Sequence, residues 1–328
     1  FKKLKNQDEL YIDITHGFRA SPMLLMTLVN YSSFLKKTTI KGIFYGAEQA
    51  TVEEAGKRIT PVWNLNDIAL LNEWTSAALE YIKFGDSERI KKLAERSALP
   101  GLKQGGQEEK NAALNILNLS KALLKTSRNF TTARGLEICK SETIKEIKNY
   151  TEEIRKENLI PPFSPFMDEI ESKLNDFEEN NVLNFLISVE YCIRHGLVQQ
   201  GITLLQEGIV TFILKELGYR WCAQTQEERN QVVQNRQDTS NSLNILHEPG
   251  KDFKASGSNG DEIYNKIKEN KTFSELAKIF SSLSKYRNDI NHGGYICPRE
   301  PENFENELRK LYHKTEKLIK EYNERDRT

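Results

Sequence analysis

Residues 10–45 constrain the fold most, because two apolar, strand-like runs flank a stretch with helical periodicity. LYIDI (10–14) and IKGIFY (40–45) have the composition of buried strands, and residues 22–36 repeat apolar side chains at helical spacing. Pro22 stands where the first turn of a helix tolerates proline. Strands joined through one helix pair in parallel. The sequence therefore predicts a βαβ unit with a parallel sheet.

Polar residues follow both predicted strands, at the edge of the sheet where α/β proteins bind ligands. They are Thr15, His16, Gly17 and Arg19 after the first strand, and Tyr45 and Gly46 at the end of the second. A cationic side chain beside a helix N-terminus can bind an anion, since the backbone N–H groups of the first turn have no partner within the helix. A local hydrogen-bond cluster with a purely structural role is the alternative use of these residues.

From about residue 66 the apolar residues recur at helical spacing almost to the end of the chain. The sequence thus predicts a mainly α protein with a smaller α/β portion. A proline-rich stretch, 159–165, is the best candidate linker. The other expected features are apolar helical stripes at 70–82, 114–123, 273–292 and 304–319, a loop at 101–106, a charged helix at 136–156, two helices in 166–218 broken near Gly196, and a loop or insertion over most of 223–262.

Composition narrows the range of functions. The 328 residues include 47 basic and 47 acidic side chains, so a nucleic acid would have to be bound by a local patch. No apolar run reaches the ~18 residues of a membrane span, and no signal peptide is visible. The four scattered cysteines suggest buried free thiols in a reducing cytoplasm. Because the chain begins with Phe1 just before a strand that looks internal to a sheet, we expect further strands to precede it.

The stretch YRNDINHGG (286–294) contains the residues most suited to catalysis, at the end of a predicted amphipathic helix. Because a helix turns about 100° per residue, Asn288 and His292 share a face, and Asn288 can orient the imidazole. Arg287 and His292 lie about 140° apart. They converge only if the last turn is distorted, which Gly293 and Gly294 permit, or if two copies of the helix meet across a symmetric dimer.

These residue types suit the cleavage of a phosphodiester. Histidine exchanges protons near neutral pH, and arginine binds phosphate oxygens through its planar guanidinium group. RNA provides its own nucleophile, the 2′-OH, so no metal is required, and the sequence shows no spacing typical of metal ligands. Arg and His near a helix C-terminus can also simply cap the helix and complement its dipole.

Two motifs together resemble a known family. RNDINH is similar to the R-polar-x3-H signature of HEPN ribonucleases, and DITHGFRASP looks like the strand-end motif of CARF domains, the Rossmann-like sensors of cyclic oligoadenylates. In this order they resemble the CARF–HEPN accessory ribonucleases of type III CRISPR systems, in the subgroup with D-x-T-H-G-F-R. IFYGA, NLNDIALLNEWTSAALEYIKFGD and GLVQQGITLLQEGIVTFIL agree with that subgroup. The strand and glycine-bearing loop that open the family's CARF domain are not in this sequence.

The resemblance implies three parts and an activity. Residues 1–64 would be the C-terminal part of a CARF ligand-sensing domain, 65–160 a helical linker or dimerisation section, and 161–328 an all-α HEPN ribonuclease domain. The protein would be a cytoplasmic homodimer or higher homo-oligomer in antiviral defence, without cofactor or membrane. Cyclic tetra- or hexa-adenylate would bind across the dimer axis as an allosteric activator. The HEPN domains would then cut single-stranded RNA without a metal, by 2′-OH attack that leaves a 2′,3′-cyclic phosphate.

By the same resemblance, Arg287 and His292 are the catalytic pair and Asn288 orients the histidine. The ligand-binding motif comprises Thr15, His16, Gly17 and Arg19, with Tyr45 and Gly46 close to it. The alternative is a non-catalytic cyclic-nucleotide sensor or RNA-binding partner whose R-x4-H helix only builds a dimer interface. Slow degradation of the activator at the CARF site is a further possibility.

For the other histidine and aromatic candidates, a structural role is a better interpretation than a role in the site. Arg194 and His195 precede Gly196 at a predicted helix break, and we expect a surface turn there. The three tryptophans, Trp63, Trp74 and Trp221, are expected in the core rather than as platforms for stacked bases.

Overall fold

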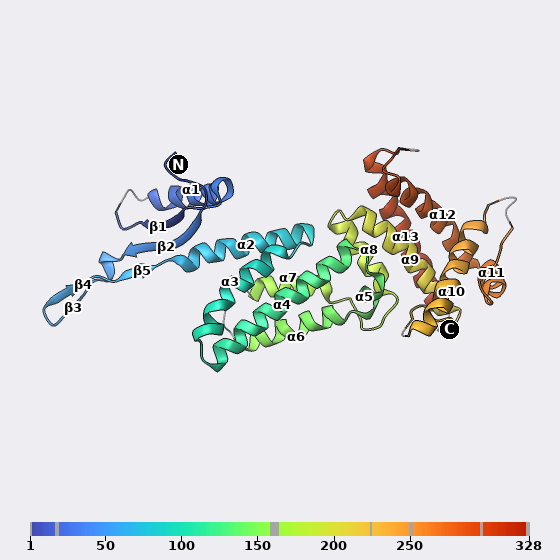
Figure 1. Cartoon of the computed structure of the whole chain (residues 1–328), viewed down its shortest axis with the longest axis horizontal. Coiled ribbons are helices and arrows are strands. Elements are labelled where there is room, and N and C mark those ends of the chain that lie inside the picture. The colour runs from blue at the N-terminus through green and yellow to red at the C-terminus, as the bar shows by residue number, and fades with distance from the viewer. Residues whose placement is uncertain are drawn as a thin grey trace. The chain divides into compact units, whose positions relative to one another are not determined.

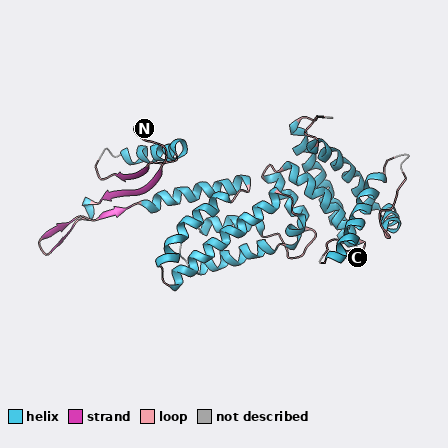
Figure 2. Cartoon of the chain, viewed as in Figure 1, coloured by secondary structure: helices cyan, strands magenta, loops and turns pink. Residues whose placement is uncertain are grey.

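The computed structural model describes residues 2–16, 20–157, 164–223, 225–248, 252–295 and 298–325. The chain divides into two compact units, residues 1–79 and 80–328 (Figure 1). Among the described residues the strands belong to the first unit and helices form the second (Figure 2). The predicted mainly α fold with an α/β portion is therefore confirmed. Residues 158–163, which hold most of the expected linker, lie outside the described residues.

The predicted βαβ unit is present in the first unit. Strand β1 (Glu9–Asp13), helix α1 (Ser21–Lys36) and strand β2 (Thr39–Gly46) follow in order, and β1 pairs with β2 in parallel. Pro22 lies in the first turn of α1, where its missing N–H has no helical partner to lose. The core of this unit is small and contains Ile12, Val29, Ile43 and Ala69.

Short extended segments that the sequence analysis did not predict complete this unit. Strand β5 (Val62–Asn64) pairs antiparallel with β2 and gives the sheet order β1-β2-β5. A 3-10 turn (Glu48–Ala50) precedes a hairpin of β3 (Val52–Glu54) and β4 (Lys57–Ile59). Three-residue strands with exposed side chains on both faces carry no apolar alternation, which is why periodicity does not reveal them.

Helix α2 crosses the boundary between the units, and the second unit begins with a group of helices. Their bounds are α2 (Asn66–Phe84), α3 (Glu88–Gln104), α4 (Gln107–Thr131), α5 (Gly135–Lys140), α6 (Glu142–Glu157) and α7 (Ser164–Leu174). Two predictions need correction here. Helix α3 continues to Gln104, so only Gly105 and Gly106 of the expected loop remain outside helices. The expected charged helix is broken at Ser141, whose φ of 58° is left-handed.

The C-terminal helices surround α9. They are α8 (Asn184–Arg194), α9 (Val198–Glu216), α10 (Gln226–Ile245), α11 (Gly260–Glu269), α12 (Lys271–Asn291) and α13 (Pro301–Arg325). Helices α8, α10, α12 and α13 all contact α9, whose side chains from Leu204 to Leu214 are almost all buried (Figure 1). The predicted break near Gly196 is confirmed, and its φ of 68° explains the glycine. The segment before it forms two helices, α7 and α8, rather than one.

The expected loop over 223–262 is wrong, because α10 and the start of α11 occupy most of it. Helix α10 begins where the Thr225 side chain accepts a hydrogen bond from the Glu228 amide. Its buried face is largely polar, and only Val232 and Leu243 are buried apolar side chains. Asp238, which is fully buried, accepts a 3.0 Å bond from the Gly257 amide. A helix whose buried face makes hydrogen bonds lacks the apolar stripe on which the prediction relied.

In the described part of the chain, no helix combines the length and apolar character needed to cross a membrane. Cys139 and Cys192 are buried free thiols as predicted, and burial raises the pKa of each to about 12. Cys222 is a free thiol that is only half-buried. Cys297 lies outside the described residues.

Candidate functional site

Helix α12 carries the predicted catalytic residues. Its N-terminus is capped by Asn270, whose side chain accepts a 3.1 Å bond from the Phe273 amide. The apolar face includes Phe273, Leu276, Phe280 and Leu283, all buried. Because α12 packs against α9 along this face, the residues near its C-terminus lie beside the middle of α9.

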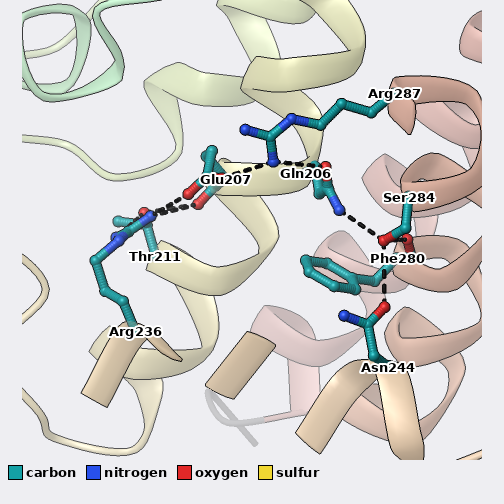
Figure 3. A network of polar contacts seen from close by, with 8 residues as sticks. All are labelled: Gln206, Glu207, Thr211, Arg236, Asn244, Phe280, Ser284 and Arg287. Carbon is teal, nitrogen blue, oxygen red and sulfur yellow. Dashed lines mark hydrogen bonds and ion pairs between the residues drawn. The ribbon is translucent and has the colours of Figure 1, made fainter. Parts of the chain in front are cut away.

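Arg287 is held against α9 by two hydrogen bonds. Its Nη1 donates to Oε1 of Gln206 and to Oε1 of Glu207, each at 3.1 Å (Figure 3). The Arg287 side chain remains 36% exposed, so it is positioned by these contacts without being removed from solvent. A guanidinium group fixed in this way can still offer its remaining N–H groups to a phosphate.

The Glu207 carboxylate binds a second arginine from α10. Arg236 donates from Nη2 to Oε2 of Glu207 at 2.8 Å and from Nη1 to Oγ1 of Thr211 at 2.9 Å (Figure 3). One carboxylate thus links two guanidinium groups from different helices. The sequence analysis missed both Glu207 and Arg236. A signal for Glu207 was available, since Glu207 is the one charged residue in the sequence stretch 202–214.

Gln206 extends the network across the helix interface. Its Nε2 donates to Ser284 Oγ at 2.7 Å, and the Ser284 hydroxyl lies 3.2 Å from Asn244 Oδ1 (Figure 3). These side chains line a cleft of about 500 Å³, together with Lys285, Arg287, Asn288 and Asn291. The cleft therefore has two basic side chains, two carboxylates (Glu207 and Glu248) and several amide groups, so Arg287 and Lys285 are the groups in it that can bind a phosphate.

Asn288 and His292 are both exposed at the end of α12. In this described part of the chain, their side chains do not form the predicted hydrogen bond. Their hydrogen bond is between backbones: the His292 amide donates to the Asn288 carbonyl at 2.9 Å. Helix α12 is regular to Asn291, and the left-handed residues Gly293 and Gly294 come only after His292. The last turn is therefore not distorted in a way that would bring His292 to Arg287.

Asp289, between the predicted catalytic residues, has a structural role. Its carboxylate is almost completely buried and accepts a 2.9 Å bond from Nη1 of Arg299. The Arg299 guanidinium lies 4.8 Å from the centre of the Tyr286 ring. The Gly294 amide donates to the Asp289 carbonyl at 3.0 Å. These contacts attach the segment after α12 to the helix end that carries His292.

At the sheet edge, the structure brings together Thr15 and Gly46, as the parallel sheet predicts. Thr15 Oγ1 accepts a 2.7 Å bond from the Gly46 amide, and the Thr15 amide donates to Asp13 Oδ1 at 2.8 Å. Hydrogen bonds from the Thr15 hydroxyl and amide lower the pKa of the Asp13 carboxyl. A Cβ on Gly46 would lie only 3.0 Å from Thr15 Cγ2, so a larger residue would push the Thr15 side chain by a few tenths of an ångström.

The other predicted ligand residues at this edge make no hydrogen bond to Thr15 or Gly46 among the described residues. His16 is exposed, and the predicted ligand residues Gly17 and Arg19 lie outside the described residues. The Tyr45 hydroxyl donates to Gln49 Oε1 at 3.0 Å, and its ring lies 6.1 Å from that of Trp63 on the neighbouring strand. Trp63 is 49% exposed, so its expected place in the core is wrong. Trp74 is buried as expected, and Trp221 is half-buried.

The expected surface turn at Arg194–Gly196 is present, but the His195 side chain is buried within it. Its side chain packs 4.2 Å from the centre of the Tyr191 ring, and Nδ1 lies 3.2 Å from the Lys83 carbonyl oxygen. Burial lowers its pKa, since it disfavours the charged imidazolium. Arg194 and Gly196 on either side of it are exposed, so the imidazole alone is turned inward from this turn.

Comparison with known proteins gives a partial match. No protein-family model matches the chain. Over 178 residues it is 26% identical to a protein of Methanocaldococcus jannaschii that is named "CRISPR-associated protein MJ1674". The match covers 54% of this chain, which spans only 25% of the length of that relative. The chain is therefore similar, over about half its length, to a CRISPR-associated protein.

Proposed function

We propose that the chain acts in CRISPR antiviral defence as a metal-independent endoribonuclease for single-stranded RNA, activated by a cyclic oligoadenylate. The observation that carries the proposal is Arg287, held by Gln206 and Glu207 at the edge of a polar cleft, five residues before an exposed histidine. The similarity to a CRISPR-associated protein supports the biological setting.

The reaction assigns one role to each residue. Neutral His292 takes the proton from the 2′-OH, whose oxygen attacks the adjacent phosphorus. The bond from phosphorus to the 5′ oxygen breaks, and a protonated imidazole returns a proton to that leaving oxygen. Arg287 stabilises the negative charge on the phosphoryl oxygens. The products are a 2′,3′-cyclic phosphate and a 5′-hydroxyl.

A complete site needs two copies of the chain. Arg287 and His292 point in directions about 140° apart on a regular helix, and α12 is regular through this stretch. A twofold axis beside the end of α12 would bring the arginine of one copy near the histidine of the other. Activator binding would then change how the two copies of α12 meet, so that the arginine of one copy approaches the histidine of the other.

The sheet edge at Thr15 and Gly46 is the proposed activator site. The 2.7 Å bond from the Gly46 amide to Thr15 Oγ1 holds the two strand ends close together, and α1 begins at Ser21, six residues after Thr15 in the chain. The first-turn amides of α1 and the side chains of His16 and Arg19 would bind phosphate groups of the cyclic ligand.

The test is an RNA cleavage assay in EDTA, with cyclic tetra-adenylate and cyclic hexa-adenylate added separately. We expect one ring to trigger cleavage and His292→Ala to abolish it, while the variant binds the activator with unchanged affinity. Arg19→Ala should weaken activation and leave basal cleavage intact. Cleavage that requires a divalent metal, or that persists in His292→Ala, would contradict the mechanism.

The alternative is a sensor without catalytic activity whose α12 forms an interface between copies. The absence of a side-chain bond from Asn288 to His292 in the structure of these two residues favours it, because the imidazole then has no partner from Asn288 to orient it. RNA binding without cleavage, in a protein that still binds a cyclic oligoadenylate, would establish this function instead.

A further inference from the structure

We propose that a second cavity, on the other side of Glu207 from Arg287, binds one unstacked nucleobase. The assignment of this base to the RNA substrate rests on the proposed function. The cavity measures about 330 Å³ and is formed by α5, α8, α9, α10 and residues 221–223. This volume lies within the usual range of small-ligand sites and accommodates a purine.

The position of the cavity relative to Arg287 supports a nucleotide as the ligand. Glu207 lines both this cavity and the polar cleft that contains Arg287. Its Oε1 lies 3.1 Å from Arg287, and its Oε2 lies 2.8 Å from Arg236 in the wall of the cavity (Figure 3). A phosphate at Arg287 and a base in the cavity are thus separated by one carboxylate group, which a single nucleotide can span.

The lining of the cavity suits a flat aromatic ring. Most of it is apolar, with Ile138, Phe185, Leu204 and Val232 among the contributing side chains. Half-buried Trp221 offers an aromatic surface, and proteins that bind single-stranded nucleic acids hold unstacked bases on such rings. The proposed ligand therefore uses the tryptophan as a platform for stacking, in contrast to the core role expected from sequence.

The polar groups of the cavity suggest which bases fit. Each oxygen of the Glu207 carboxylate has a lone pair beyond the one used by its arginine. That carboxylate can accept a hydrogen bond from an exocyclic amino group, which adenine, guanine and cytosine have and uracil lacks. Arg236 can donate to a ring nitrogen or carbonyl of the same base. The cavity should therefore disfavour uracil.

The test measures binding, so that it does not depend on cleavage. The full chain with His292→Ala is titrated against labelled single-stranded RNAs of one sequence, each with an abasic site at one successive position. We expect one position at which loss of the base weakens binding about tenfold, the size of a single stacking contribution. Uracil at that position should bind more weakly than adenine but more tightly than the abasic site, because it can stack on Trp221 and lacks the exocyclic amino group.

Two variants locate the effect in the cavity. Thr203→Phe fills it from α9, and Trp221→Ala removes the aromatic platform; each should abolish the difference between the intact and the abasic RNA. Val233→Phe adds the same ring to an exposed position of α10 and should leave the difference unchanged. Thermal unfolding of all three confirms that they are folded.

The outcomes separate the proposals. Equal affinity for every abasic RNA, together with no change of Trp221 fluorescence on adding adenosine or guanosine monophosphate, would overturn the nucleobase site. A fluorescence change with free nucleotide but no dependence on RNA bases would assign the cavity to a free nucleotide. A base-dependent affinity without cleavage by the unmodified protein would support the cavity and overturn the ribonuclease.

Discussion

At the scale of single residues, Glu207 determines where Arg287 lies. Its side chain is 45% exposed, and that of Arg287 is 36% exposed. Ion pairs at this exposure contribute on the order of 1 kcal/mol or less to stability, because water screens the charges. The contribution of Glu207 is therefore mainly geometric: its two oxygens fix the directions of two guanidinium groups.

Replacement of Glu207 by glutamine should affect cleavage more than folding. The amide keeps one acceptor oxygen but loses the charge that holds both arginines, so we expect kcat to fall about tenfold, since misplaced catalytic groups are costly. The midpoint of thermal unfolding should fall by no more than a few degrees. Activated cleavage and circular dichroism measure the two effects.

The matched control is Glu305→Gln, which removes a surface ion pair with Arg309 at 2.6 Å. It should leave both cleavage and stability unchanged. If Glu207→Gln cleaves RNA at the normal rate, Arg287 does not depend on this carboxylate for its position.

At the scale of elements, the end of α8 joins the end of α2 through His195. Burial lowers the pKa of the imidazole, the bond to the Lys83 carbonyl raises it, and the charges of Lys173 and Arg194 lower it further. The net pKa is below the ordinary value of 6.5. In the unfolded chain the same imidazole binds a proton at higher pH than in the folded protein.

Stability should therefore decrease as the pH falls below about 6.5, because the unfolded state then binds more protons than the folded state. The stability that neutral His195 provides is present above this pH and is lost as pH falls toward the folded-state pKa. Denaturant unfolding at pH ~8 and pH ~5 should show a larger loss of unfolding free energy for the unmodified protein than for His195→Gln. An equal loss in the two proteins would show that His195 is not the group that titrates.

The stability of the C-terminal end of α12 depends on a different contact, the ion pair of Asp289 and Arg299. The Asp289 side chain is 3% exposed, so removing its partner leaves a charge away from water. Breaking such a pair typically costs about 3 kcal/mol. We expect Arg299→Ala to lower the unfolding free energy by about this amount, measured by urea denaturation.

Hydrogen exchange gives the second measurement for this prediction. The amide of Gly294, which donates to the Asp289 carbonyl, should exchange faster in Arg299→Ala than in the unmodified protein. Arg309→Ala, which breaks an exposed pair on α13, serves as the control with little effect on either quantity. Unchanged protection of Gly294 would mean that the pair does not hold the segment after α12.

At the scale of the whole molecule, cleavage should depend on association of chains. If the catalytic pair is completed by two copies of α12, the rate per chain falls on dilution in step with the dimer fraction. Activated cleavage over a dilution series, compared with sedimentation velocity at the same concentrations, measures this relation. A rate per chain that stays constant while dimers dissociate would place a complete site in one copy.

The sequence by itself determined the local elements with clear periodicity. The strands at 10–14 and 40–45, the helix between them and the helix that ends in RNDINH all follow from apolar spacing, because burial of one face requires that spacing. The meeting of Thr15 with Gly46 could also be predicted, since parallel strands end at the same edge. Polar helix α10 could not, because its buried face makes hydrogen bonds and has little apolar surface.

Only the tertiary structure decided the surroundings of Arg287. Glu207 and Arg236 lie 80 and 51 residues away from it along the chain (287 − 207 and 287 − 236), and they meet only because α10 and α12 both pack against α9. The packing around α9 also formed the two cavities that share Glu207, and a separate contact with the Lys83 carbonyl of α2 positions His195. Sequence periodicity reports which face of a helix is buried; it does not report which other helix covers that face, and the covering helices determine the partners of each polar side chain.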